Sequence, residues 1–242
     1  MGYFEEIIAL LQEIQESQHE AMERAAQVIA DAIEADHLVY VFGATHAGIL
    51  AQELFYRAGG LVPVNPVLPP GLVTDVRPVT LTSRLERMPG LGSEIVAESP
   101  IEAGDVLIVH SVSGRNAAVV EFALGAQELG AFVIALTSVG YSSSVTPRGP
   151  GLPRLFEMAD LVLDNRAPVG DALIALPGLA QLVGPSSTIT GAAILNAIVV
   201  RVADLLMART GDPPIFMSAN LDGGDAFNER WLTHYKGRLT YL

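Results

Sequence analysis

The chain has 242 residues, half of them hydrophobic, and a formal net charge of −13. That length suits one large α/β domain, and the acidic balance argues against nucleic acid and anionic membranes as partners, because either surface needs a basic patch. No cysteine is present, so no disulfide, zinc thiolate or thiol nucleophile is available. We expect a single domain over 1–242, with an N-terminal helical extension (1–36), an α/β core (37–210) and a C-terminal tail (211–242).

The first predicted element is helical. Apolar residues between Phe4 and Ile33 recur at helical spacing with Glu and Gln between them, which predicts one long helix or two, ending near Ala35. This apolar stripe packs either on the protein's own sheet or on a partner subunit, and the sequence does not separate the two. The acidic start lacks the basic residues and the short apolar run of a signal peptide, so we expect a cytoplasmic protein.

A strand is predicted over 38–42, followed by a turn and a helix that reaches Arg57. Thr45 and His46 lie in this turn, and open parallel sheets bind ligands at such turns. His46 is therefore a candidate site residue, although a helix-capping or half-exposed histidine has the same pattern.

Another strand is predicted over 61–67, with its prolines at its ends or at the edge of the sheet. The polar stretch 74–92, which contains Glu86, has no clear period and is predicted to be irregular. Loops of this length are uncommon in compact domains unless they have a function.

The segment 104–116, GDVLIVHSVSGRN, combines an apolar strand (106–109) with a small polar turn. A helical pattern begins at Ala117, so the turn lies at a helix N-terminus. Unsatisfied N–H groups and the helix dipole favour an anion there. We predict a phosphate-binding cradle at this turn.

The side chains of the turn suit the same role. Ser111 and Ser113 add two hydroxyl donors, Gly114 allows close backbone approach, and Arg115 adds charge. The alternative is that Ser113 only caps the helix. Neither G-x-x-x-x-G-K-[ST] nor G-x-G-x-x-G is present, so a nucleotide is not the expected ligand.

A further strand over 132–136 ends at Thr137, a flexible Ser/Pro/Gly stretch covers 140–153, and a short strand follows over 161–163. Strands that alternate with helices in this way imply a doubly wound parallel sheet flanked by helices.

The run 172–200 has no charged residue, but prolines and glycines interrupt it, so it is predicted to be a buried helix rather than a membrane span. Ser187 and Thr188 open a helix whose residues 189–207 are apolar almost all round, and Ser186 or Ser187 is its predicted cap. Such a helix must be central or at a subunit interface.

The tail 218–225, SANLDGGD, is rich in carboxylates and amides and could bind a hard cation or sugar hydroxyls. The ordinary interpretation is a glycine turn with Asp225 capping a last helix that runs through Tyr235. The regular D-x-D-x-D-G pattern of calcium sites is missing, and no metal is expected. No cofactor is expected either.

From residue 38 to residue 207 the chain resembles the sugar isomerase (SIS) domain family, mainly through DVLIVHSVSGRN, which is similar to the family's strand followed by S-x-S-G. The N-terminal helix and SANLDGGD resemble a branch that is sometimes labelled phosphoheptose isomerase. The resemblance implies a flavodoxin-like three-layer fold. It also implies a homodimer or homotetramer with composite sites.

In characterised SIS relatives the S-x-S-G loop holds the phosphate of a sugar, which corresponds to Ser111, Ser113, Gly114 and Asn116 in this chain. Asn116 stands where many relatives have threonine, and Ala47 stands where the first loop often has serine. The predicted binding set is completed by residues of the neighbouring turns: Arg115, Thr45, Thr137, Ser187 and Thr188.

Phosphosugar isomerisation needs an acid that opens the ring and a base that moves a proton between adjacent carbons. The base candidates are Glu53, which resembles a glutamate of the isomerase-like relatives, and Glu86, which resembles one of the etherase-like relatives. Glu53 ranks slightly ahead because it follows His46, the acid candidate, by two helical turns. Each glutamate has an arginine close in sequence and can be a simple ion-pair partner. His110 and His234 are reserve acids.

We therefore expect a phosphosugar-binding protein that acts as an aldose–ketose isomerase. Two alternatives remain: an etherase or lyase acting on an amino-sugar phosphate, and a non-catalytic phosphosugar sensor. The first 35 residues are too short and too acidic for the DNA-binding module that a sensor usually carries.

Overall fold

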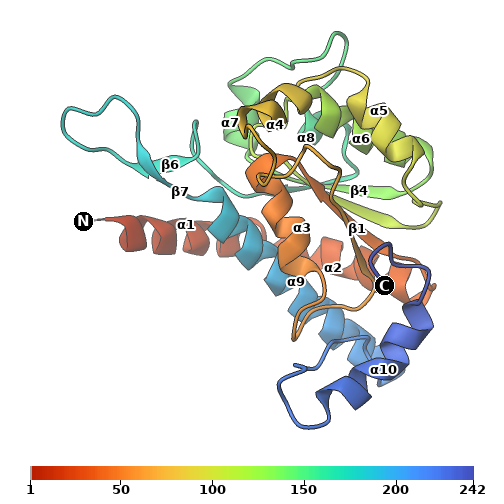
Figure 1. The fold of residues 1–242 in the computed structure, drawn as a ribbon. Helices are drawn as coiled ribbons and strands as arrows, with labels where there is room; N and C mark the ends of the chain where they lie inside the picture. Colours follow the sequence, from red (N-terminus) through yellow and green to blue (C-terminus); the bar gives the residue numbers. More distant parts are fainter. Residues whose placement is uncertain (1) are drawn as a thin grey trace.

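Five parallel strands form the central sheet of the computed structural model, which describes residues 2–242 (Figure 1). The strands, in the spatial order β2-β1-β3-β4-β5, are β1 (Val39–Gly43), β2 (Val64–Val67), β3 (Val106–His110), β4 (Phe132–Thr137) and β5 (Leu161–Asp164). This order confirms the predicted doubly wound sheet, in which each crossover passes through helical segments. A two-stranded antiparallel sheet is separate from it and consists of β6 (Ala172–Ile174) and β7 (Val183–Pro185).

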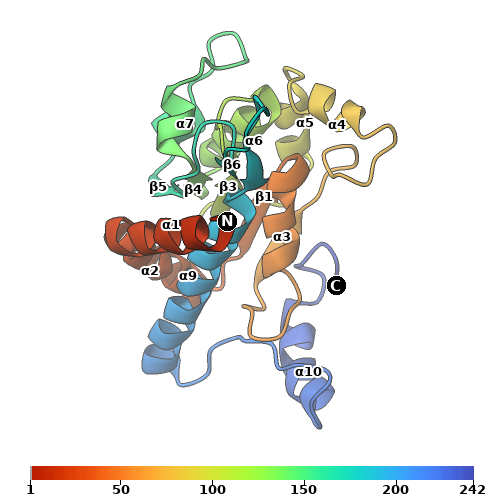
Figure 2. The ribbon, with the colours of Figure 1, turned by 90° about the vertical axis from the view of Figure 1, so that its left-hand side faces the viewer.

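The helices surround the central sheet on both faces (Figures 1 and 2). They are α1 (Tyr3–Ser17), α2 (His19–Glu34), the 3-10 helix η1 (Thr45–Gly48), α3 (Ile49–Leu54), α4 (Thr80–Leu85), α5 (Leu91–Ala97), α6 (Ala117–Glu128), α7 (Val139–Ser143), α8 (Leu155–Met158), α9 (Ser187–Thr210) and α10 (Gly224–Tyr235).

Two hydrophobic cores lie on opposite faces of the sheet, because successive strand side chains point to opposite sides. Val41 and Ile108 belong to the core shared with α2, α3 and α9. Phe42 and Leu107, their neighbours in the chain, belong to the core shared with α5, α6, α8 and the end of α10. The expected three-layer arrangement therefore follows directly from the alternation of apolar residues along each strand.

Helix α9 is long and apolar enough to cross a membrane by length and composition alone. In this fold its buried face packs against α2 and α3 within the first core. A core helix of a globular protein passes the same compositional test, and packing explains the apolar residues on the buried face of α9, while Val200 and Met207 are exposed.

The prediction of one buried helix over 172–200 is wrong for its first half. Residues 172–185 form the β6–β7 hairpin, which projects from the body beside the N-terminal end of α1 (Figure 1). Gly178 and Gly184 both adopt positive φ, at 79°, and so break any helix there. The Tyr3 hydroxyl donates to the carbonyl oxygen of Pro185 at 2.6 Å and ties α1 to the hairpin.

Other boundaries also differ from the expectations. The N-terminal stripe forms two helices, one of the two predicted possibilities. The stretch 74–92 is not irregular throughout, since it contains α4 and the start of α5. The strand expected over 61–67 begins only at Val64, because Leu61 pairs with Ile215 in an isolated bridge instead.

Candidate phosphate-binding site

The turns after β1 and β3 meet at the carboxyl edge of the sheet, where the strand order reverses. Gly43, the last residue of β1, is in register with His110, the last residue of β3. From these two strands the chain departs toward β2 on one side and β4 on the other. Such switch points leave a crevice in which doubly wound folds bind ligands.

The β3–α6 loop presents a row of backbone donors that no protein group uses. Within residues 2–242, the N–H groups of Val112, Ser113, Arg115, Asn116 and Ala117 donate to no protein oxygen. These five residues lie in the loop and at the start of α6. Gly114, which lies among them, is the exception, because its N–H donates to the carbonyl oxygen of Ser111. Several free donors together with a helix dipole favour an anion.

Gly114 is required for the shape of this loop. Its φ is +55°, in the left-handed region, and an added Cβ would lie 3.0 Å from the Ser142 hydroxyl and 3.1 Å from that of Thr137. The loop is also fastened from behind, since the Thr137 hydroxyl and the Ser138 N–H both donate to the carbonyl oxygen of Val112. Thr137 is fully buried, so it supports the loop rather than facing a ligand.

Glu86 lies beside the cradle, just after the end of α4. Its carboxylate accepts a hydrogen bond from the side-chain amide of Asn116, the N-cap residue of α6. Its carbonyl oxygen accepts the N–H of Ala118 at 3.1 Å. Burial raises the pKa of Glu86 above the usual value, against the opposing effects of Arg87, Arg148 and hydrogen bonds from Thr45 and Asn116. The structure thus brings an ionisable carboxylate to the start of α6.

Thr45 holds an unusual backbone conformation in the β1–η1 turn. Its φ is +59°, which is rare and strained for a β-branched residue, and its N–H donates to the carbonyl oxygen of Leu72 at 2.7 Å. Its side chain lies within reach of the Glu86 carboxylate. His46, the next residue, is exposed and has no side-chain hydrogen bond within residues 2–242.

Arg148 also reaches the cradle, although no sequence pattern singled it out. Its N–H donates to the carbonyl oxygen of Arg115 at 2.8 Å, and its Nη1 donates to Oδ1 of Asn116 at 2.9 Å. Arg148 belongs to the stretch 140–153, which looked merely flexible. The Ser/Pro/Gly composition of this stretch does not indicate which distant residues it contacts.

Glu53 has different partners from Glu86. It forms an ion pair with Arg57 and accepts a hydrogen bond from Asn196 of α9 at 3.1 Å. The expected continuous helix from His46 to Glu53 is wrong, because η1 carries His46 and α3 begins only at Ile49. The argument that two helical turns place both side chains on one face therefore does not hold.

Ser187 and Thr188 start α9, as expected, but the capping group comes from elsewhere. Asp171 accepts hydrogen bonds from the N–H groups and hydroxyls of both Ser186 and Ser187. Its carboxylate thus occupies the N-terminus of α9, where the predicted serine cap makes no such bond. Asp171 precedes Ser186 by 15 residues and Ser187 by 16, so no short sequence motif reveals this cap.

His110 is buried between these turns. Its Nδ1 donates to the carbonyl oxygen of Ala47 at 3.2 Å, and its Nε2 has no partner within residues 2–242. Burial lowers the pKa of His110 to about 4, only partly opposed by the Ala47 carbonyl and Asp171. His110 is therefore neutral near pH 7 and has no proton on Nε2 to give. His234 lies elsewhere, 3.2 Å from a carboxylate oxygen of Asp36.

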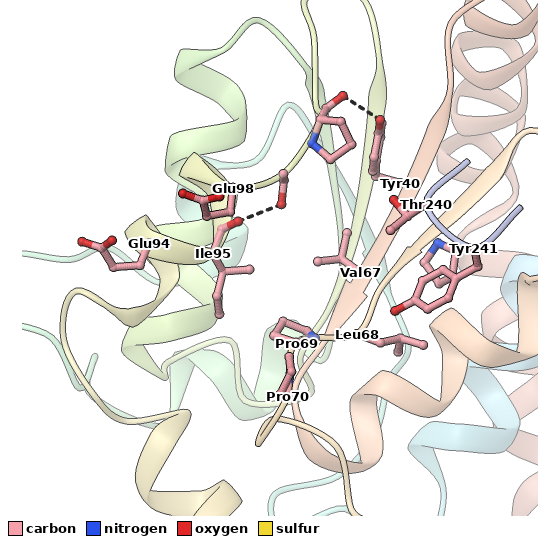
Figure 3. Close-up of a pocket in the computed structure, with 13 residues that line it drawn as sticks. Tyr40, Val67, Leu68, Pro69, Pro70, Glu94, Ile95, Glu98, Thr240 and Tyr241 are labelled. Carbon is pink, nitrogen blue, oxygen red and sulfur yellow. Dashed lines mark hydrogen bonds between the residues drawn. The ribbon is translucent and has the colours of Figure 1, made fainter. Parts of the chain in front are cut away.

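Two further places are separate from the cradle. In the tail, Asp225 lies inside α10 rather than capping it, and Gly223 is the N-cap residue. Within residues 2–242, no three acidic or histidine side chains gather as metal ligands. A cavity of about 430 Å³ lies between α5 and the C-terminal residues, and its wall includes four prolines and two tyrosines, with Glu94 on α5 and Glu98 just after it (Figure 3). It shares no residue with the cradle.

Comparison with known sequences identifies relatives along the whole chain. The profile of the SIS domain matches residues 2–138. A UPF0309 protein of Shouchella clausii is 44% identical over 240 residues, which cover 99% of this chain and 98% of that protein. A UPF0309 protein of Brucella canis is 43% identical over 240 residues, covering 99% and 97%.

Solved structures with the same fold include two phosphoheptose isomerases. The one from Francisella tularensis has a TM-score of 0.54 at 19% identity, covering 83% of this chain and 94% of that chain. The one from Neisseria gonorrhoeae has a TM-score of 0.55 at 19% identity, covering 86% and 96%. A protein of E. coli, solved in complex with a ligand, has a TM-score of 0.52 at 18% identity, covering 84% and 87%. At these identities the likeness concerns the fold.

Proposed function

The chain belongs to the SIS domain family, and we propose that it binds a sugar phosphate at the start of α6 and interconverts its aldose and ketose forms. One observation carries this proposal: the free N–H groups of the β3–α6 loop lie next to the carboxylate of Glu86. The N–H groups suit a phosphate, and a partly buried carboxylate with a raised pKa suits proton transfer.

Once the phosphate is held and the sugar ring is open, the transfer of the proton between adjacent carbons needs a fixed carboxylate. An oxygen of Glu86 takes the proton from the carbon next to the sugar carbonyl, and the electron pair left behind forms an enediolate. The same carboxyl group returns the proton to the neighbouring carbon, while the hydroxyl proton of the enediolate passes to the former carbonyl oxygen, so that the carbonyl group forms at the adjacent carbon. Holding the phosphate fixes the distance from Glu86 to the reacting carbons, which is why binding and catalysis depend on one loop.

Ring opening requires a separate acid, and His46 in the β1–η1 turn is our candidate for it. His46 is exposed, so it is free to meet a bound sugar. We rank Glu86 ahead of Glu53 as the base, because the carboxylate of Glu53 is already engaged by Arg57 and Asn196.

A second candidate function is elimination from an amino-sugar phosphate, as in an etherase or lyase. The position of Glu86 favours it, since the etherase-like relatives of the resemblance carry a glutamate in the corresponding segment. Both reactions begin with removal of a proton next to a carbonyl. They differ in whether a substituent then leaves, so product analysis of the sugar phosphate separates them, and binding without either reaction indicates a sensor.

Ser113→Ala tests the phosphate site. We expect sugar-phosphate affinity to fall about 10- to 100-fold, because a hydroxyl bonded to a charged group contributes about 1.5–3 kcal/mol. Isothermal titration with a sugar phosphate and the same sugar without phosphate measures the effect. Ser93→Ala, at an exposed position on α5, is the matched control and should bind like wild type. Equal affinity of the wild type for both sugars would contradict the proposal.

We propose also that the chain forms a homodimer or homotetramer through α1, α9 and the hairpin. Phe4 on α1 and Val200 on α9 are 72% and 70% exposed, and Leu179 in the hairpin is 51% exposed. Several large exposed apolar side chains on neighbouring elements are typical of an interaction surface. Light scattering at micromolar concentration should give at least twice the chain mass, and Val200→Asp should lower it. A monomeric wild type would overturn this part of the proposal.

A further inference from the structure

The arginines of this chain differ in their partners. Most form an ion pair with a carboxylate within 4 Å, namely Arg57, Arg154, Arg166, Arg201, Arg209, Arg230 and Arg238. The other six arginines form no such pair within residues 2–242, and three of them, Arg87, Arg115 and Arg148, belong to or adjoin the cradle. All three surround the first turn of α6.

The backbone holds these arginines beside the cradle. Arg115 is part of the β3–α6 loop, and its carbonyl oxygen accepts the N–H of Arg148 at 2.8 Å. The guanidinium of Arg148 contacts Oδ1 of Asn116, whose amide nitrogen in turn donates to Glu86, the residue before Arg87. A chain of contacts therefore runs from Arg148 through Asn116 to Glu86, beside Arg87.

The three guanidiniums act on one another electrostatically. Burial lowers the pKa of Arg148, and the positive charges of Arg115 and Arg87 lower it further, while Glu86 opposes them. The Nε of Arg115 is buried and has no partner in the part of the chain that the structure describes. Among residues 2–242, Glu86 is the one carboxylate that acts on Arg148, so three guanidiniums share a single anionic neighbour, and a bound anion relieves the remaining repulsion.

A phosphate at the helix N-terminus does not need all three arginines as ligands. The free N–H groups, the hydroxyls of Ser111 and Ser113 and the nearby Arg115 suffice to hold a phosphate dianion at a helix N-terminus. Arg87 and Arg148 remain, and the carboxylate between them is that of Glu86 alone.

We infer that the ligand of the cradle is a sugar phosphate that carries a second anionic group, such as a carboxylate, and that Arg148 and Arg87 bind this group. The inference rests on the proposed function, because it assumes that the first turn of α6 holds the phosphate. It narrows the substrate class from sugar phosphates in general to those that also carry a carboxylate.

A matched pair of ligands tests the inference. Gluconate 6-phosphate and glucitol 6-phosphate have the same open carbon chain and differ only in a carboxylate in place of a hydroxymethyl group. Isothermal titration of the full-length protein should show about 10-fold tighter binding of gluconate 6-phosphate, the size of effect expected for one charge-assisted contact. Arg87 and Arg148 are exposed, so the ratio should shrink as salt is added.

The arginine variants assign the effect to residues. Arg148→Gln and the double variant with Arg87→Gln should bring the ratio of the two affinities close to one, and glucitol 6-phosphate should still bind. Arg24→Gln, which removes an exposed arginine on α2 far along the chain from the cradle, is the charge-matched control and should keep the wild-type ratio. Melting temperatures check that each variant is folded.

The outcomes separate the inference from the proposed function. Equal binding of the two phosphates by the wild type, with glucitol 6-phosphate still bound more tightly than glucitol, overturns the inference and leaves the phosphate site standing. The inference is also overturned if the folded Arg87→Gln, Arg148→Gln double variant still prefers gluconate 6-phosphate. If glucitol 6-phosphate binds no better than glucitol, the proposed function fails and the inference fails with it.

Discussion

Replacing Glu86 with glutamine should lower turnover of the best-binding sugar phosphate by about 100- to 10,000-fold, the range for loss of a general base. Glutamine preserves the shape of the side chain and can still accept the amide proton of Asn116. Binding of the sugar phosphate should therefore change only slightly. The measurement is exchange of the proton at the carbon next to the carbonyl, followed by NMR in deuterated water.

The pH profile gives a second readout of the same variant. A carboxylate accepts a proton only when it is ionised, so kcat/KM should fall as pH falls through the pKa of Glu86. Burial raises that pKa above the ordinary value of 4.5, and the acid limb of the profile should be displaced upward accordingly. Residual activity of Glu86→Gln should lack this limb.

Glu53→Gln is the matched control for this assignment. Its ion pair with Arg57 and its bond to Asn196 suggest a structural role, so turnover should change little. The assignment is wrong if Glu53→Gln abolishes exchange while Glu86→Gln remains active. It is wrong too if neither variant slows the reaction.

His110→Gln should make the protein less sensitive to acid. The pKa of His110 is lowered from 6.5 to about 4 in the folded protein by burial. Below pH 6.5 the unfolded chain binds a proton that the folded protein does not bind, so stability falls until pH reaches about 4 and then levels off. From about pH 7 to about pH 4.5 this loss amounts to about 2–3 kcal/mol.

Urea unfolding at the two pH values measures this contribution. Carboxylates elsewhere also titrate, so the informative quantity is the difference between wild type and His110→Gln in the stability lost on acidification. The variant should lose about 2–3 kcal/mol less, even if glutamine costs stability at about pH 7. An equal loss in both proteins would show that the pKa of His110 is not lowered in the folded state.

The strand, turn and helix of the candidate cradle could be predicted because their signals are local. An apolar run from Val106 to Val109 precedes a small polar turn, and helical periodicity follows from Ala117, so strand, turn and helix are all visible within one short stretch. The structure has the same three elements there, with β3 extended to His110.

The neighbouring carboxylate was harder to predict for a physical reason. Helices α4 and α5 have six and seven residues, too short to show a periodicity, and so Glu86 seemed to belong to a loop of unknown course. Glu53 looked better placed because the pattern suggested one continuous helix, which η1 interrupts. Tertiary packing, rather than local propensity, decides which glutamate reaches Asn116.

Contacts between distant parts of the chain could not be predicted at all. Asp171 caps α9 from across the hairpin, and Arg148 joins the cradle through a backbone bond to Arg115. Neither residue lies in a motif, and composition alone made both segments look like linkers or core. A single sequence gives no sign that two such distant residues are in contact.

The sheet can close only late during synthesis. One face is covered by α2 together with α9, which lie far apart in the chain, and an ion pair of Glu23 with Arg201 joins the two helices. The apolar side of α2 must therefore wait, without its partner, until the residues of α9 leave the ribosome. Truncated nascent chains should remain protease-sensitive and dependent on chaperones up to that length, and should then become resistant over a short further extension.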